Sequence, residues 1–549
     1  MRPTNMKRAI SKTRLFLAPI VAVALALMLT ATAHAAAPGI KGLTFSLTAQ
    51  SSYITQPDGQ AIYSWGYGCA TSYTPSFAPA NITGTCPTMQ VPGPTLIVNE
   101  GDTVTVTLTN NLPTAAGNTS ILFPGFQLQA FTDGVPGLLT QEAAPGSTVT
   151  YKFTASSPGT RAYYSGTQGD LQVEMGLYGA IIVLPKTIPA ACTSGLAAAN
   201  LAVEANWGEK DYRLASAAYD HAKSCYDREY LFQFSEMDPN IHTQALAQVS
   251  DAKRISACAA GVGTPGCSLE VPTEPYHPAY FMINGRSMPD NMDTNYAAQY
   301  PQQPYNGNPH MHPGEQVLIR VIGQGRWQHP FHEHGNHVRI LGRDGNLIVS
   351  QPDPNSLAGP LMFTTTTTPG LAFDGIFYWT AKGLNWDAYG HNPASNDPNA
   401  KLPCNPDANG YNTGPAAYSA INYYEWCQDH NKPVQAAPFG DVATGGPVTL
   451  PDSNILTNGP WYGGSPYLGP DATTRATGCS PGAPAGSCGA SGTTPPSGTI
   501  ANSPSGEAGF AFMWHSHNER EITTSNAFPG GMLMMMLVDS REFVIDESN

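Results

Sequence analysis

The sequence predicts an all-β protein built from two β-sandwich units, with a long insertion in the second unit. The chain has 55 glycines and 49 prolines, and only 12% of its residues are charged, a composition typical of many short strands joined by turns. Several segments alternate apolar and polar side chains, as a strand with one buried face does. This rhythm stops over residues 381–508 and then returns, which indicates an insertion within a β-unit.

The first 35 residues have the features of a secretory signal. Five basic residues accompany the apolar run LFLAPIVAVALALML, and ATAHA offers a cleavage site after Ala35. That run is short for a membrane anchor, which needs roughly 20 apolar residues, and no later segment is long enough. Cleavage would leave 21 basic against 40 acidic residues, a net charge of −19. We therefore expect a secreted or periplasmic protein with no membrane span after cleavage, and neither nucleic acid nor anionic membrane as a partner.

The first predicted unit covers residues 41–187. Residues 91–108 alternate apolar and polar side chains around a Gly-Asp turn at 101–102, a pattern that predicts a β-hairpin with one buried face. The segments 146–155 and 177–185 repeat the alternation. A linker over residues 188–224 follows.

The second predicted unit covers residues 225–549. Its expected strands lie before and after the insertion, in REYLFQFSEM (228–237), YFMINGRSM (280–288), GEQVLIRVIG (314–323), residues 363–380, GFAFMWHSH (509–517) and GGMLMMMLVDS (530–540). The insertion, residues 381–508, is rich in Gly, Pro, Asn and Ser and carries four of the ten cysteines. A three-domain layout is the fallback, since 188–310 is short for a further domain.

All ten cysteines lie in the part that would be exported. Their count and setting fit structural disulfides in an oxidising compartment, although the sequence does not fix the connectivity. A metal–thiolate site is the weaker alternative, because no Cys-x-x-Cys occurs. Their spacing favours pairing between neighbours: 69 with 86, 192 with 225, 258 with 267, 404 with 427, and 479 with 488.

Two short histidine-rich segments carry the chemistry, HPFHEHGNHVRILGRDG (329–345) and MWHSHNERE (513–521). Alternate side chains of a strand point the same way, so each His-x-His pair presents two imidazoles on one face. If the two strands pair, four imidazoles converge, a donor set that suits copper, zinc, iron or nickel. The four are His332, His334, His515 and His517.

Other side chains near these pairs are further candidates. His329 and His337 lie close by as candidate ligands, and Glu333, Glu519 and Glu521 could orient a ligand or bind the ion. A lone His-x-His is more often a solvated surface feature, and this interpretation remains open for His310-x-His312. However, eight of the thirteen histidines beyond the signal lie within 310–337 and 515–517, which argues against chance clustering.

The chain resembles the multicopper oxidase family. HPFHEHGNHVRIL resembles the family's His-Pro-x-His-Leu-His-Gly-His signature, and WHSHNERE resembles its His-Cys-His-x-x-x-His signature. GPTLIVNEGDTVTVTLTN, TDGVPGLLTQEAAPGSTVTYKF and GLYGAIIV resemble framework segments of its first domain. The resemblance implies two cupredoxin-like Greek-key β-sandwich domains. It also implies that His332 would bind type 2 copper, and that His334, His515 and His517 would bind the type 3 pair.

The chain departs from this family at most of its copper ligands. Where the family has His-Trp-His, this sequence has Leu122-Phe123-Pro124, and where the family has two further histidines it has Tyr164 and Gly166. No histidine occurs between residues 36 and 220, so the first domain offers no imidazole to any metal site.

The type 1 copper site is altered as well. Ser516 stands at the position of the cysteine and Glu521 at that of a histidine, so only His329 remains, with Met532 as an axial remnant. A serine hydroxyl cannot replace the soft thiolate of that centre. Laccase chemistry, with four electrons passed to dioxygen, is therefore not expected.

We expect the four remaining imidazoles to share one ion, copper first, with zinc or iron as alternatives. The leading hypothesis is an exported copper-dependent oxidoreductase that acts on a small molecule or dioxygen at a mononuclear site. A non-catalytic metal-buffering or partner-binding protein is the rival. A metal-dependent hydrolase with Glu519 or Glu521 as acid or base is a third reading. Related two-domain families often form homotrimers, so a homotrimer is a further expectation by analogy.

Two further features have more than one interpretation. Tyr163, Tyr164 and Gln168 replace ligand positions, and they either fill the emptied site or line a channel. The run MLMMMLV (532–538) could bind copper(I) through its thioethers, but core packing is the interpretation we expect.

Overall fold

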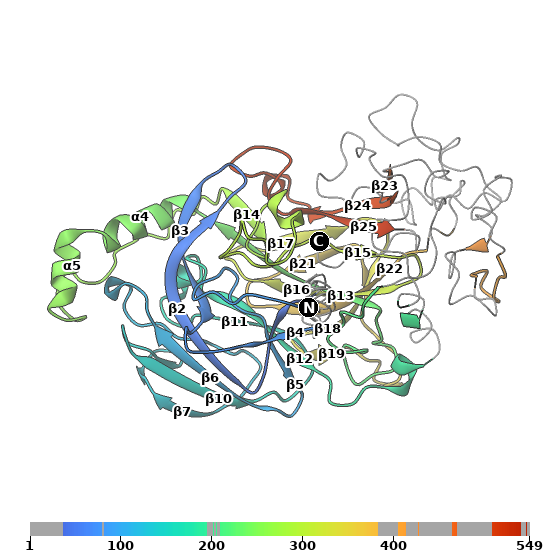
Figure 1. Ribbon diagram of the computed structural model, residues 1–549, viewed down its shortest axis with the longest axis horizontal. Coiled ribbons are helices and arrows are strands. Elements are labelled where there is room, and N and C mark those ends of the chain that lie inside the picture. Colours follow the sequence, from blue (N-terminus) through green and yellow to red (C-terminus); the bar gives the residue numbers. More distant parts are fainter. Residues whose placement is uncertain are drawn as a thin grey trace, which may run out of the picture.

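In the computed structural model, the strands form four principal sheets stacked as two sandwiches (Figure 1). The described residues are 37–79, 82–194, 201–202, 205, 209–380, 382, 404–412, 426–427, 464–468, 508–539 and 545. The expected signal (1–35) and most of the expected insertion lie outside them. Among the described helices, none is long and apolar enough to cross a membrane.

The first sandwich consists of two five-stranded sheets. One has the order β11-β12-β5-β1-β4 and the other the order β3-β2-β6-β10-β7, and β8 and β9 form a separate pair. Their inner faces enclose an apolar core that includes Phe45, Trp65 and Tyr151. The strands are β1 (Gly39–Lys41), β2 (Thr44–Thr55), β3 (Ala61–Cys69), β4 (Ser76–Ala78), β5 (Leu96–Asn99), β6 (Thr103–Asn110), β7 (Leu128–Asp133), β8 (Val135–Pro136), β9 (Gln141–Glu142), β10 (Thr148–Thr154), β11 (Gly159–Tyr164) and β12 (Tyr178–Leu184).

The predicted hairpin over residues 91–108 is wrong. β5 and β6 follow each other in the chain but belong to opposite sheets. β5 pairs in parallel with β12 and β1, whereas β6 pairs in parallel with β2. The burial patterns differ accordingly, because β6 alternates between buried and more exposed residues while β5 is buried along most of its length. A run buried on both faces is typical of a strand inside a parallel arrangement.

The second sandwich also consists of two sheets. The third sheet has the order β14-β13-β16-β22-β18-β19, with β20 also paired to β18. The fourth sheet has the order β15-β25-β24-β17-β21, with β23 also paired to β24. Their strands are β13 (Arg228–Met237), β14 (Tyr280–Ile283), β15 (His310–Met311), β16 (Gln316–Gly323), β17 (His329–Glu333), β18 (Val338–Arg343), β19 (Asn346–Leu347), β20 (Leu361–Met362), β21 (Thr364–Thr367), β22 (Ala372–Tyr378), β23 (Gly464–Leu468), β24 (Ala508–Ser516) and β25 (Leu533–Asp539).

This architecture confirms the all-β, cupredoxin-like fold. Each sandwich contains parallel pairs between strands distant in the chain, such as β2 with β6 and β13 with β16, as Greek-key connections produce. Residues of both sandwiches also share one apolar cluster, which includes Ile97, Leu231 and Ile322.

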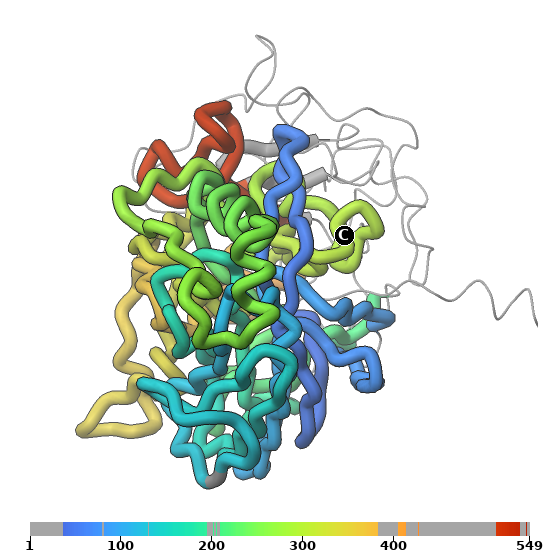
Figure 2. The backbone as a smooth tube through the Cα atoms, turned by 90° about the vertical axis from the view of Figure 1, so that its left-hand side faces the viewer, coloured from blue at the N-terminus to red at the C-terminus, as the bar shows by residue number. Residues whose placement is uncertain are grey.

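Two helices interrupt the second unit, and they were not predicted from the sequence. α4 (Pro239–Val249) and α5 (Ala252–Ala259) follow β13, and α4 lies along the long strand β3 (Figure 2). Ile241 and Ala245 join the core of the first sandwich. Asp238 and Asp251 accept hydrogen bonds from the first turns of the two helices, so each helix begins with a capping carboxylate. The remaining short helices are η1 (Thr114–Ala116), α2 (Gly169–Gln172), η2 (Ala190–Thr193), η3 (Asp290–Met292) and η7 (Glu519–Ile522).

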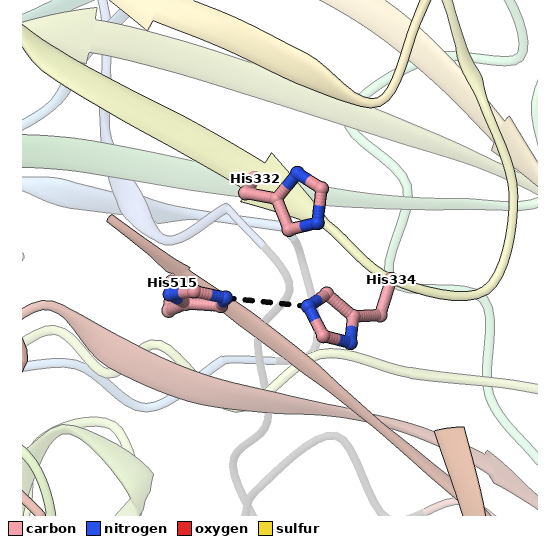
Figure 3. A group of neighbouring side chains, drawn as sticks. All are labelled: His332, His334 and His515. Carbon is pink, nitrogen blue, oxygen red and sulfur yellow. Dashed lines mark hydrogen bonds between the residues drawn. The ribbon is translucent and has the colours of Figure 1, made fainter. Parts of the chain in front are cut away.

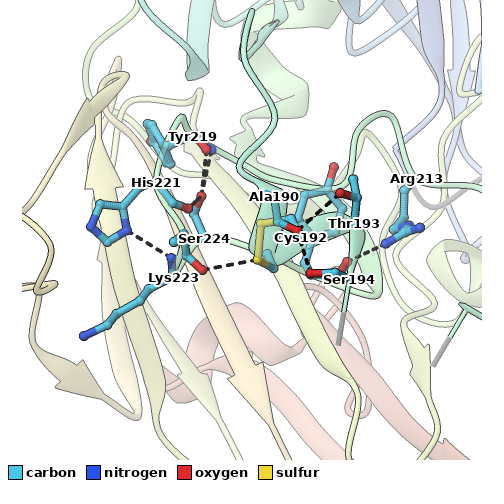
Figure 4. The surroundings of a disulfide bond; sticks show 12 residues. Ala190, Cys192, Thr193, Ser194, Arg213, Tyr219, His221, Lys223 and Ser224 are labelled. Atoms are coloured by element: carbon cyan, nitrogen blue, oxygen red, sulfur yellow. Dashed lines mark hydrogen bonds between the residues drawn. A yellow bond between two sulfur atoms is a disulfide. The ribbon is translucent and has the colours of Figure 1, made fainter. Parts of the chain in front are cut away.

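Four of the expected disulfides form between neighbouring cysteines: 69–86, 192–225, 258–267 and 404–427. Cys479 and Cys488 lie outside the described residues. The bond between Cys192 and Cys225 fastens the start of the connecting segment to the start of the second sandwich (Figure 4). Beside it, the Ser224 hydroxyl donates to the Tyr219 carbonyl over 2.8 Å.

Candidate metal centre

Three imidazoles converge where β17 and β24 lie side by side. The two strands are antiparallel neighbours, and His332 directly opposes His515 in their register. One ring nitrogen from each of His332, His334 and His515 lies within 4.8 Å of the others. The Nε2 atoms of His334 and His515 are 3.2 Å apart, and the rings face one another (Figure 3).

Strand geometry explains this convergence. Phe331 and Glu333 point into the core together with Trp514 and Ser516, so His332 and His515 occupy the opposite, outer face of the fourth sheet. β17 ends at Glu333, and His334 follows it beside β24. The indole N–H of Trp514 donates to the His334 carbonyl over 2.9 Å, and the His334 N–H donates to the carbonyl of Met513 over 3.3 Å.

Gly335 makes the turn after His334 possible. Its φ of +104° lies in the region that favours glycine. A Cβ atom there would lie 3.0 Å from the ring of Phe512. Backbone conformation and the close ring therefore both require glycine at this position.

Hydrogen bonds orient two of the three rings. The Nδ1–H of His515 donates to the Ser516 carbonyl over 2.7 Å, which leaves its Nε2 with a lone pair directed at His334. The Nδ1 atom of His332 lies 2.6 Å from the hydroxyl of Thr364 on β21. Such contacts on the far nitrogen of a ring are typical of metal-binding histidines.

The local environment keeps two of these rings, those of His332 and His515, uncharged at neutral pH. Burial, followed by the nearby His334, His515 and His517, lowers the pKa of His332 to about 4. Burial also lowers the pKa of His515. Neutral imidazoles are the form that binds metal ions.

The other predicted ligands and carboxylates on this face lie at the rim. The ring of His517 is centred 4.9 Å from that of His332, but 53% of its side chain is exposed. The ring of His337 packs against Phe363, which separates it from His332. Glu519 is exposed and lies 3.7 Å from His517.

His329 occupies a different site on the core side of the same strand. Its Nδ1 lies 2.8 Å from Glu521 Oε2, and its Nε2 lies 2.9 Å from Glu236 Oε2. Both ring nitrogens are therefore engaged with carboxylates. Burial alone would lower the pKa of His329, but the hydrogen bonds to Glu236 and Glu521 outweigh it and raise the pKa to about 9.

Ser516 and Glu521 complete this core-side network. The Ser516 hydroxyl donates to Glu521 Oε2, and the Asn518 amide donates to Glu521 Oε1 over 2.9 Å. Glu236 Oε1 accepts the backbone N–H groups of Arg326 and Trp327, at 2.6 and 2.8 Å. The positions that resemble a type 1 copper site are thus joined by hydrogen bonds around a charged imidazole.

Glu236 was missed by sequence reasoning, although a signal existed. It lies on β13, whose ten residues are all buried. A carboxylate in such a strand needs a partner, because burying an unpaired charge is costly. The sequence does not show which distant cation that partner is.

Glu333 differs from the other acids because it points into the core. It is fully buried, and burial raises its pKa well above the usual value. The hydroxyl of Thr365 donates to Glu333 Oε1 over 2.9 Å. Glu333 therefore does not face the imidazole cluster.

His310 and His312 are buried instead of exposed. The Nε2 atom of His312 lies 2.7 Å from Glu209, which also pairs with Arg228. The His310 backbone N–H donates to the Tyr230 hydroxyl over 2.9 Å. Both histidines belong to the packing around β13 and β15, away from the three-histidine cluster.

The former ligand positions of the first sandwich border a cavity of about 300 Å³. Leu122, Tyr164 and Gly166 line it on one side, and Gln324 and Gly370 line it on the other. Tyr163 is fully buried, and its hydroxyl donates to the Pro94 carbonyl over 2.7 Å. Tyr163 therefore fills space, whereas Tyr164 lines the cavity. Gln168 lies just before α2, in the left-handed conformation.

The fold and this cluster define a class of protein, a two-sandwich cupredoxin-like protein with clustered imidazoles at a strand pair. Comparison with known proteins agrees. The family description "Multicopper oxidase" matches residues 79–188 and, in a second profile, residues 272–370. The second match contains His332 and His334, whereas His515 lies beyond it.

Individual relatives agree over short stretches. Multicopper oxidase MCE of Talaromyces pinophilus is 39% identical over 99 residues, which are 18% of this chain and 16% of that protein. Copper resistance protein A of Pseudomonas syringae pv. tomato is 38% identical over 113 residues, 20% of this chain and 18% of that protein. The alignments thus span less than a fifth of these relatives.

A solved structure, "Multicopper Oxidase mgLAC", covers 90% of this chain and 86% of its own, with 16% identity and a TM-score of 0.42. Over residues 79–188 and 272–370 the chain is thus similar to the multicopper oxidase family.

Proposed function

We propose that this protein binds one copper ion through His332, His334 and His515 and acts as an atypical oxidoreductase outside the cytoplasm. The observation that carries the proposal is the set of three ring nitrogens within 4.8 Å of one another. Copper is favoured over zinc and iron because the superfamily is named for copper and imidazole suits this metal.

The donor set fits a metal ion. Two nitrogens bound at 2.0–2.1 Å to a tetrahedral ion are about 3.3 Å apart. The measured separation between His334 Nε2 and His515 Nε2 is 3.2 Å. His517 lies beside the cluster, and a change of its side-chain conformation would bring a fourth imidazole to the same ion.

A copper ion with three imidazole ligands supplies one-electron chemistry and an open position for a small ligand. The residues around it determine how a substrate would reach it. Ser516 donates to Glu521 and provides no thiolate, so electrons have no metal-to-metal route through the core. A substrate must therefore approach the cluster itself, at the rim formed by His517 and Phe363, both of which are exposed.

The non-catalytic alternative rests on the same observation. A protein that only stores or carries copper needs the imidazoles but no electron relay, and it would bind copper without turnover. The hydrolase alternative has less support, because both oxygens of Glu521 accept hydrogen bonds and Glu521 lies on the core side with His329.

The test is metal analysis and electron paramagnetic resonance on protein purified without added copper and then titrated with Cu(II). We expect one copper per chain with an ordinary type 2 spectrum. His332→Ala and His515→Ala should lose the bound copper, whereas His221→Ala, at a half-buried histidine elsewhere, should keep it. Metal-free wild-type protein that refuses Cu(II) would overturn the proposal.

Turnover separates the oxidoreductase from the storage protein. Oxygen consumption with small phenols or inorganic reductants, lost in His515→Ala, would support the enzyme. Tight copper binding without turnover of any such substrate would support storage.

Export is the second part of the proposal. Four disulfides in the described residues are typical of an oxidising compartment. Intact-mass analysis of the protein purified from its own host should show a chain that begins at Ala36. A chain that retains its first 35 residues would contradict cleavage.

A further inference from the structure

The outer face of the fourth sheet carries two methionines next to the three-histidine cluster. Met513 on β24 and Met535 on β25 directly oppose each other in the antiparallel register. Directly opposed residues point to the same face, with Cβ atoms about 4.5–5.5 Å apart. Two thioether groups are therefore neighbours across the strand pair.

The register places both methionines on the face that holds the imidazoles. Met513 lies two residues before His515 on β24, so the two side chains share a face and are about 7 Å apart along the strand. The His334 N–H donates to the Met513 carbonyl over 3.3 Å, which places His334 on the other side of Met513. Met535, Met513 and His334 thus form a row beside the row of His515 and His332.

The neighbouring methionines of the same run behave differently. Met534 opposes Trp514 and Met536 opposes Phe512, and all four side chains are fully buried in the core. Met513 and Met535 are only partly buried. Core packing, the interpretation expected from the sequence, thus accounts for Met534 and Met536. Met535 packs only against the edge of that core, and Met513 is not part of it.

Thioether sulfur is a soft, neutral donor. Such donors select copper(I) over copper(II), whereas imidazole accepts both. We propose that Met513 and Met535, with His334 at their side, form a copper(I) site that adjoins the imidazole cluster. The proposal deepens the proposed function, because it adds a position for the reduced ion next to the copper site suggested above.

The chemistry of the two rows is complementary. An ion held by the two thioethers is favoured as Cu(I), and an ion held by three imidazoles is stable in either oxidation state. His334 borders both rows, so an ion could pass from one row to the other with a ligand in common. No electron transfer is required for this step.

The test is an anaerobic Cu(I) titration against a chromophoric Cu(I) chelator, repeated with Ag(I) as a redox-inert substitute. The variant is Met513→Leu/Met535→Leu, since leucine keeps the side-chain volume. The matched control is Met534→Leu/Met536→Leu, which changes the same run on the core face. Thermal unfolding of both variants verifies that they fold.

We expect the outer-face variant to lose one equivalent of Cu(I) or Ag(I), or to bind it about tenfold or more weakly, a difference of at least 1.4 kcal/mol. The core-face control should retain wild-type affinity. X-ray absorption of the Cu(I)-loaded wild type should show sulfur neighbours at about 2.3 Å, the usual metal–sulfur distance. Unchanged Cu(I) and Ag(I) affinity in the outer-face variant would overturn the proposal.

The experiments distinguish failure of the proposed imidazole site from failure of the proposed thioether site. Cu(II) binding is read from the paramagnetic signal and depends on His332 and His515, whereas the thioether site is read from Cu(I) and Ag(I). A type 2 signal with no methionine-dependent Cu(I) binding would reject the thioether site alone. Methionine-dependent Ag(I) binding without Cu(II) binding would reject the imidazole site alone.

Discussion

Two histidine sites lie on opposite faces of the same two strands, and they use imidazole in opposite ways. On the outer face, His332, His334 and His515 lie together, and burial lowers the pKa of His332 and of His515, so these two rings are neutral. On the core side, His329 lies between two carboxylates and is held charged. The difference shows that neighbouring carboxylates decide whether a buried histidine is neutral or charged.

The largest expected change comes from converting the core-side site into a metal site. Ser516→Cys combined with Glu521→His should yield a strongly blue copper protein, because a thiolate and two imidazoles with a weak methionine ligand favour such a centre. Glu521→His would release His329 Nδ1, while Glu236 would still hold Nε2. Met532 is close, since its carbonyl accepts the Ser516 N–H over 2.9 Å.

Absorption spectroscopy after copper addition checks this prediction. Ser516→Cys alone is the control and should remain nearly colourless, because Glu521 would still be hydrogen-bonded to His329 Nδ1. A double variant that folds but stays colourless and binds no copper would show that the core-side site does not have the geometry of a type 1 copper site.

The second prediction separates the two faces by single substitutions. His329→Ala leaves two buried carboxylates without their cation, so the free energy of unfolding should fall by about 3–5 kcal/mol while copper binding persists. His515→Ala should abolish copper binding and lower the unfolding free energy by only about 1 kcal/mol. Urea denaturation of the metal-free proteins and Cu(II) titration measure the two effects. Loss of copper binding in a folded His329→Ala would contradict this division.

The third prediction concerns pH. The pKa of His329 is raised to about 9, so its contribution is complete below about pH 6.5, the unfolded value, and is lost as pH rises toward 9. The expected loss is about 3 kcal/mol. Burial raises the pKa of Glu174 to about 8, which also lowers stability as pH rises from about 4.5 to 8.

Thermal unfolding of the metal-free protein between pH 5 and 9 tests this slope. His329→Gln should make the loss of stability between pH 6.5 and 9 less steep, and the remaining loss, which ends near pH 8, should be that of Glu174. A stability that rises with pH over that interval would be inconsistent with an imidazolium at His329.

The smallest predicted effect concerns the turn beside the outer cluster. Gly335→Ala should cost about 1–2 kcal/mol, because φ is +104° and the new Cβ would press on Phe512. It should also weaken copper binding by displacing His334. Gly101→Ala is the matched control, because its φ is +88° but nothing lies within 4 Å of the added Cβ, so it should cost stability without affecting copper. Equal copper affinity in both variants would show that the turn does not position His334.

The sequence predicted what depends on local pattern. Alternation located strands such as β6 and β10, and cysteine spacing gave the four disulfides that the described residues contain. The clustering of histidines located His332, His334 and His515. These successes share a cause, because the information lies in local composition and spacing, with the paired cysteines at most 33 residues apart.

What the sequence missed depends on long-range pairing. Alternation cannot tell a hairpin from two strands in opposite sheets, so β5 and β6 were joined wrongly. The partners of His329 and His312 lie about 90 to 190 residues away in the chain. Only the register of β24 with β25 distinguishes Met513 and Met535 from their buried neighbours. The caps of α4 and α5 were readable but were overlooked.

The proposed ligands His334 and His515 are separated by 181 positions. The donor set is therefore assembled only when nearly the whole polypeptide has been synthesised and its last strands have docked. Under the proposed function, metal loading would be a late event in maturation, and a product truncated before β24 would lack the three-histidine cluster however well its earlier strands folded. A bound ion would in turn link the middle of the chain to its end. Retention of the ion would therefore indicate that the final strands are folded in place.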